Sequence, residues 1–144
     1  MAIARPTHRR LFVVFDRAYG RLARRAGAML ADVSVKPAQA TALVYLGYHN
    51  GCQLSELANG VGAGNAAATG LVDRMEKSGL VERRKLQSDG RGKTVHLTAA
   101  GLHTREQVME RLRILDEQLS KNFTDAEMET VYKFLNVASE SEIK

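Results

Sequence analysis

The sequence predicts a mainly α-helical domain that carries one small β-hairpin. Apolar residues recur at helical spacing through residues 11–30 and again through residues 108–138. Between residues 80 and 98 the pattern changes to two short strand-like stretches, which are separated by a loop containing Gly90 and Gly92. The 144 residues amount to about one domain. We therefore expect a single unit, residues 1–144, built of helices with one β interruption.

Four helices are expected before the hairpin. They run over residues 11–30, from Lys36-Pro37 to Asn50-Gly51, over residues 55–59, and from Gly64-Asn65 to Ser78-Gly79. Pro37 favours a helix start, because proline is tolerated at the first helical position. Gly60 and Gly62 stop the third helix, and the turn that they form before the fourth makes a helix-turn-helix.

The hairpin and the last two helices follow. Strands are expected over residues 80–86 and 93–98, with a loop over residues 87–92. Thr98 is a natural N-cap for the fifth helix, and Thr124 for the sixth. Gly101 in the first turn of a helix costs roughly 1 kcal/mol relative to alanine, so we expect a close backbone contact there.

The apolar stripes of the terminal helices cannot be buried by each helix alone. Together with the long first helix, the fifth and sixth helices are typical of a subunit interface. Packing within one chain is the alternative.

Positive charge is concentrated in two parts of the chain. Lysine and arginine number 21 against 16 acidic residues, giving a net charge of +5. The excess lies in residues 1–36 and 77–93, whereas residues 123–144 are acidic. Segregated positive charge suits a polyanion such as nucleic acid. Solvated helix faces are the alternative explanation.

Several classes of protein are disfavoured by the composition. No apolar run reaches the roughly 18 residues of a membrane span, and the N-terminus lacks a secretory pattern, so we expect a cytoplasmic protein. Cys52 is the single cysteine, which excludes an internal disulfide. No nucleophile motif, phosphate-binding glycine loop or complete metal-ligand set is present, so we expect no enzyme, metal or cofactor.

The order of the elements is that of a winged helix, and the stretch SDGRGK is the tip of the wing. Basic residues on this hairpin form a rim that can follow phosphates: Arg83, Arg84, Lys85, Arg91 and Lys93. Arg91 is the candidate for entry into a narrow minor groove, where the potential is most negative.

Asp89 is an unusual residue beside phosphate, because its charge repels DNA. A carboxylate that accepts from Arg74 or Arg91 would brace the loop. A plain Asp-Gly turn is the alternative.

From about residue 11 to the end, the chain resembles the MarR (multiple antibiotic resistance) regulators. The stretches KPAQATALVYL, LSELANGV and GLVDRMEKSGLVERR are similar to the second, third and fourth helices and first wing strand of that family. The wing is similar as well, with Asp89-Gly90-Arg91 followed by VHLTAAG at 95–101.

The resemblance implies a homodimer that binds palindromic operator DNA, most often a repressor released by a small aromatic or phenolic ligand or by an oxidant. Residues 1–34 and 102–144 would supply the dimerisation helices and residues 36–100 the winged helix-turn-helix lobe. The implied DNA-binding residues are Asn65, Ala66, Thr69, Gly70, Arg74, Arg83, Arg84, Asp89, Arg91 and Lys93.

The recognition helix departs from the family pattern. Its expected DNA side offers few donors beyond Asn65 and Thr69, while Ala66 can only touch a thymine methyl. Gly90 also replaces a common arginine of the wing. We expect modest sequence discrimination, with affinity carried by the wing and by phosphate contacts. A winged helix that binds a protein partner instead of DNA is the alternative.

The sequence offers two hypotheses for a site that responds to a signal. In the family the effector pocket lies where the first two helices meet the dimer helices, and the candidates here are Arg17, Tyr19, Tyr45, Tyr48 and His49. Cys52 invites a redox hypothesis, whereas a structural thiol is the simpler interpretation.

Overall fold

The computed structural model describes residues 10–86 and 92–140. Its elements are α1 (Leu11–Leu30), η1 (Ala31–Val33), α2 (Pro37–Tyr48), β1 (Cys52–Gln53), α3 (Leu54–Gly60), α4 (Asn65–Lys77), β2 (Val81–Lys85), β3 (Lys93–Leu97), α5 (Ala99–Ser120) and α6 (Asp125–Ser139). The winged helix-turn-helix fold predicted from the sequence is confirmed, and all six expected helices are present and begin within one or two residues of their expected starts.

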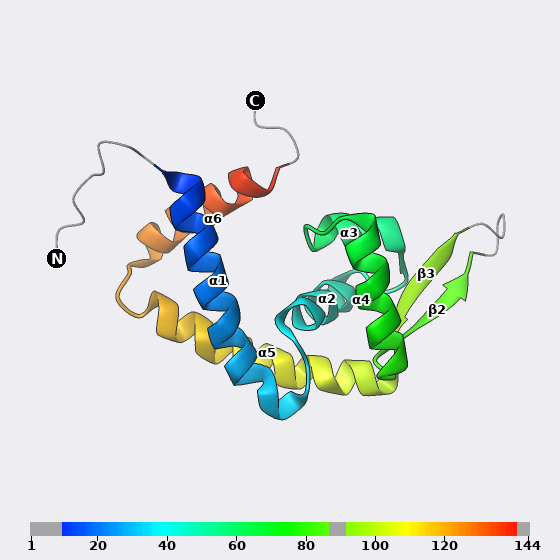
Figure 1. Ribbon diagram of the computed structural model, residues 1–144. Coiled ribbons are helices and arrows are strands. Elements are labelled where there is room, and N and C mark those ends of the chain that lie inside the picture. The colour runs from blue at the N-terminus through cyan, green and yellow to red at the C-terminus, as the bar shows by residue number, and fades with distance from the viewer. Residues whose placement is uncertain (1–9, 87–91, 141–144) are drawn as a thin grey trace.

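The chain forms a lobe and a set of terminal helices, which the long helix α5 connects. The lobe contains α2, α3, α4 and the sheet, whereas α6 and the first turns of α1 lie at the other end (Figure 1). The core belongs to the lobe: Leu43 and Leu46 of α2, Val72 and Met75 of α4, and Val108 of α5 are fully buried. The first half of α5 is thus a structural part of the lobe.

The sheet has three antiparallel strands in the order β1-β3-β2. The strand β1 was not predicted, because two residues carry no periodicity and form a strand only by pairing with β3, where Cys52 lies opposite Val95. Cys52 is therefore buried in the sheet and not placed in a simple turn. Burial and, less strongly, the charge of Glu56 raise the pKa of the thiol, which disfavours the reactive thiolate of a redox sensor.

The junction between the hairpin and α5 is tightly built. The Thr98 hydroxyl oxygen accepts from the Gly101 N–H at 3.0 Å, and the same hydroxyl donates to the carbonyl oxygen of Gly79 at 2.5 Å. A Cβ on Gly101 would collide with the carbonyl oxygen of Leu80. The expected cap and the expected close backbone contact are both confirmed.

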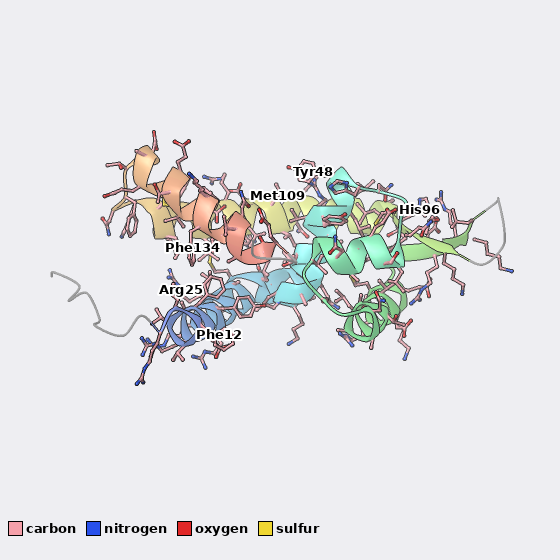
Figure 2. All side chains as sticks on the ribbon, turned by 90° about the horizontal axis from the view of Figure 1, so that it is seen from above. Phe12, Arg25, Tyr48, His96, Met109 and Phe134 are labelled. Carbon is pink, nitrogen blue, oxygen red and sulfur yellow. The ribbon has the colours of Figure 1, made fainter. Side chains whose placement is uncertain are left out.

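The terminal helices leave a large apolar surface exposed. Phe12 of α1 is 83% exposed, and Phe134 of α6 is exposed as well (Figure 2). α6 contains no buried residue, although Thr124 caps its start as predicted and Glu127 completes a capping box. Packing within one chain therefore does not cover the stripe of α6. Within residues 10–86 and 92–140, no helix combines the length and the apolar character that a membrane span requires.

Candidate nucleic-acid interface

Helix α4 presents one face to the core and the other to solvent. Ala68, Leu71 and the following apolar residues of its stripe are buried. Asn65, Ala66 and Thr69 are exposed at its N-terminal half, with Gly70 half-buried beside them. The residues predicted to read DNA therefore share an accessible face, as the helical period requires. The Thr69 hydroxyl donates to the carbonyl oxygen of Asn65 at 2.8 Å, which leaves its oxygen able to accept.

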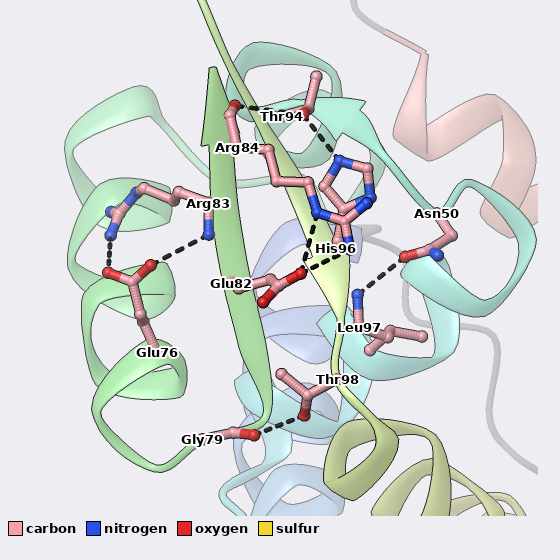
Figure 3. Close-up of polar contacts among 10 residues, drawn as sticks. All are labelled: Asn50, Glu76, Gly79, Glu82, Arg83, Arg84, Thr94, His96, Leu97 and Thr98. Carbon is pink, nitrogen blue, oxygen red and sulfur yellow. Dashed lines mark hydrogen bonds and ion pairs between the residues drawn. The ribbon is translucent and has the colours of Figure 1, made fainter. Parts of the chain in front are cut away.

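The outer half of the hairpin carries exposed cations. Lys85 and Lys93 lie directly opposite each other in the register of β2 and β3, and both are exposed. Arg84 is also exposed, and its Nη2 lies 2.5 Å from a carboxylate oxygen of Glu82 (Figure 3). Like charges in directly opposite positions destabilise a hairpin. A bound polyanion would relieve that repulsion.

Arg83 has a different environment from the other basic residues of the wing. Its guanidinium lies between the two carboxylates of α4, at 2.5 Å from Asp73 and 2.9 Å from Glu76, and its side chain is only 17% exposed. Burial acts to lower the pKa of Arg83, but the hydrogen bonds and charges of Asp73 and Glu76 outweigh burial and raise it. The sequence placed Arg83 on the phosphate rim and did not anticipate these two partners.

Arg74 lies exposed on the flank of α4 that faces α2. With Lys36 and Lys77 it lines a hollow between the start of α2 and the end of α4. Asp89, for which Arg74 and Arg91 are the two candidate partners, and Arg91 itself both lie outside the described residues.

A cavity of about 490 Å³ lies between α1, α2, α4 and α5. Of the five candidate effector residues, only Tyr19 lines it. Tyr45 instead stacks on His49 with ring centroids 4.4 Å apart, and Tyr48 lies under the guanidinium of Arg105 at 5.1 Å. Arg17 is exposed on α1 and does not line the cavity.

The polar groups that do line the cavity come from elements far apart in the sequence. Besides Tyr19, they are Thr41 of α2, Arg74 of α4 and Asp116 of α5. Burial raises the pKa of Asp116. Sequence reasoning missed all three as effector residues, because no local pattern indicates that these helices converge on one space.

Known proteins match this chain in the lobe and beyond it. The sequence model of the MarR family matches residues 35–93. The helix-turn-helix-type transcriptional regulator YfiV of Bacillus subtilis (strain 168) is 30% identical over 111 residues, which cover 77% of this chain and 68% of YfiV. The chain belongs to the MarR family. The resemblance seen in the motifs is thereby confirmed.

Two further relatives match a larger share of this chain. The helix-turn-helix-type transcriptional repressor IacR of Pseudomonas putida is 26% identical over 126 residues, or 88% of this chain and 75% of IacR. A cysteine-to-serine mutant of MarR from E. coli, complexed with operator DNA, superposes with a TM-score of 0.81 at 26% identity, covering 89% of this chain and 92% of that one. As a MarR-family transcriptional regulator, the protein is not an enzyme.

Proposed function

We propose that this MarR-family protein is a homodimeric repressor that binds palindromic operator DNA and releases it when a small aromatic or phenolic ligand binds. The observation that carries the proposal is the joint exposure of the α4 face and of the outer wing, where Lys85 and Lys93 lie opposite each other. In a winged helix these two surfaces serve the major groove and a flanking minor groove. The MarR mutant with the similar fold is complexed with operator DNA.

The terminal helices support the dimer. Phe12, Val131 and Phe134 are exposed on α1 and α6, and large exposed apolar residues on neighbouring ends of a chain favour an interaction site. A second copy offers the same surface, which a two-fold interface requires. Two-fold symmetry of the protein matches palindromic half-sites about one helical turn apart.

Sequence discrimination is expected to be modest. On the accessible face of α4, Asn65 can pair with adenine and Thr69 can serve several bases, whereas Ala66 and Gly70 provide no side-chain donor. Phosphate contacts from Arg84, Lys85 and Lys93, together with Arg91 outside the described residues, then supply most of the affinity.

The cavity supports the effector hypothesis. Leu30, Leu71 and Leu115 give it apolar walls that suit an aromatic ring. A phenolic hydroxyl can donate to the carboxylate of Asp116 or accept from Arg74. Because the walls come from the terminal helices and from α4, a ligand that fits only one arrangement of these parts shifts the population toward it. IacR is a repressor, which supports the proposed direction of control.

Fluorescence anisotropy tests the DNA-binding proposal. The purified protein is titrated against the duplex upstream of its own gene and against a scrambled duplex, at several salt concentrations. We expect a preference of about a thousandfold or more and a steep negative salt dependence. Equal, weak binding to both duplexes would refute a sequence-specific regulator.

A second titration tests the effector class. Phenols are compared with their methyl ethers for release of the bound duplex and for a shift in melting temperature, using Asp116→Asn as the pocket variant. We expect the phenols to act and the ethers to act less. No release by any compound would refute this effector class.

The second candidate function is a protein-interaction module. The exposed alanines of α4, Ala66 and Ala67, favour it. Arg91→Ala separates the two functions: loss of duplex binding with an intact dimer fits the DNA-binding proposal, and unchanged weak binding to both duplexes fits the module.

A further inference from the structure

Arg83 connects the wing to the recognition helix by three hydrogen bonds. Its Nη2 donates to Asp73 Oδ1 at 2.5 Å and its Nη1 to Glu76 Oε1 at 2.9 Å. Its main-chain N–H donates to Glu76 Oε2 at 3.0 Å (Figure 3). We propose that Arg83 is a positioning residue that fixes the wing against α4 and does not contact phosphate. This inference rests on the proposed DNA-binding function for its consequence, but its geometry lies within one chain.

The edge position of β2 explains why this contact is structural. Because β2 has β3 on one side only, N–H groups on its other side need a partner outside the sheet. The carboxylate of Glu76 accepts from the main-chain N–H of Arg83 with one oxygen and from its guanidinium with the other. One glutamate therefore holds both the backbone and the side chain of the edge strand.

Charge and exposure argue against a phosphate contact. The side chain of Arg83 is 17% exposed, whereas that of its neighbour Arg84 is 59% exposed. Two carboxylates surround the single positive charge of Arg83, so the group of three has a negative net charge. A group with a net negative charge repels DNA. Its contribution to DNA binding must therefore come from the position in which it holds the wing.

The hairpin has a second attachment at its base. There Thr98 bonds to the carbonyl oxygen of Gly79 through its hydroxyl and to that of Leu80 through its N–H. The strands continue beyond this point to Lys85 and Lys93. Arg83 lies between the base and the outer cations, so its bonds to α4 oppose a tilt of the hairpin about its base.

Glutamine at position 76 tests the clamp with little change of shape. Glu76→Gln replaces one acceptor oxygen by a donor NH₂, which cannot accept from the N–H groups of Arg83. The matched control is Glu82→Gln, at the residue that precedes Arg83 in β2. It removes the same charge, but Glu82 bonds to Arg84 and makes no bond to Arg83. We expect Glu76→Gln and Asp73→Asn/Glu76→Gln to weaken operator binding about tenfold or more. Glu82→Gln is expected to bind as tightly as the wild type or more tightly.

Arg83→Lys gives an independent comparison. A lysine keeps the charge for a phosphate contact but cannot form the bidentate contact with two carboxylates. The clamp therefore predicts weaker binding for Arg83→Lys, with loss of minor-groove protection at the flanks of the footprint and retention of protection under α4. A fold that is merely destabilised would lose both protections together. Binding that is unchanged in Arg83→Lys, or tighter in the double variant, would overturn the proposal.

Hydrogen exchange without DNA separates this inference from the proposed function. We expect amides of residues 81–85 and 93–97 to exchange about tenfold faster in Glu76→Gln than in Glu82→Gln, with circular dichroism confirming that both remain folded. Equal exchange in the two variants would overturn the clamp even if operator binding is confirmed. A wild-type protein without duplex preference would refute the DNA-binding function, whereas faster exchange in Glu76→Gln would still support the clamp.

Discussion

The carbonyl oxygen of Leu80 occupies the space where a side chain on Gly101 would begin. The same oxygen accepts the N–H of Thr98 at 3.1 Å, so it cannot move without releasing the cap of α5. The connection between α4 and the wing thus lies against the first turn of α5.

Gly101→Ala is expected to destabilise the protein by more than about 1 kcal/mol, although glycine to alanine inside a helix normally stabilises by about that amount. The control is Gly27→Ala in α1, where a Cβ would make only ordinary contact with Pro37 and the normal gain is expected. Urea unfolding measures both. Stabilisation by Gly101→Ala would contradict this prediction, because it would show that the Leu80 carbonyl group can move away from the new methyl group at little cost.

Lys85→Gln is expected to affect stability and DNA binding in opposite directions. Removing the charge opposite Lys93 stabilises the hairpin by about 0.2–1 kcal/mol. Log K for DNA binding falls with log salt concentration, and loss of one phosphate contact makes this negative slope shallower by about 0.9. Chemical unfolding and anisotropy at several salt concentrations test the two effects. Lys133→Gln on α6 is the control, and an unchanged salt slope in Lys85→Gln would exclude Lys85 from the interface.

Asp32→Asn is expected to remove an acid-sensitive contribution to stability. The hydrogen bond from Arg111 is the main reason that the pKa of Asp32 lies below its ordinary value. A lowered folded pKa stabilises the protein above the unfolded carboxyl pKa of about 3.9, and this contribution is lost as the pH falls through the folded value. Wild type and variant should therefore differ at pH 7 and converge in acid. Glu106→Gln on α5 is the control, and a difference that is independent of pH would refute this assignment.

Phe134→Asp is expected to dissociate the proposed dimer. An exposed aromatic on α6 that becomes buried between subunits should cost at least about 2 kcal/mol when replaced by a charge, which is a rise of about thirtyfold in the dissociation constant. Light scattering coupled to gel filtration measures the mass. Phe134→Leu keeps the apolar contact and should remain dimeric. A wild-type monomer would refute the proposed dimer, and a dimeric Phe134→Asp would place the interface elsewhere.

Much of the architecture could be predicted because its signals are local. The helical spacing of apolar residues located α1, α5 and α6, and single side chains such as Thr98 and Thr124 marked helix starts. Even the close contact at Gly101 followed from the local cost of a helical glycine. These features depend on neighbours within a few residues of the chain.

The partners of individual side chains depend on long-range packing and could not be predicted from the sequence. In the sequence, Arg83 is one of several similar basic residues of the wing. Its ion pairs with Asp73 and Glu76 form only because β2 packs on α4. The strand at Cys52 forms only by pairing with β3. The cavity is lined by Tyr19 and Asp116, which lie far apart in the sequence, and not by Tyr45 or Tyr48. The six helices and the two hairpin strands could be located from the sequence alone, since short-range periodicity and capping encode them. Register and helix packing decide which of those elements meet, because both depend on the shape of the whole core.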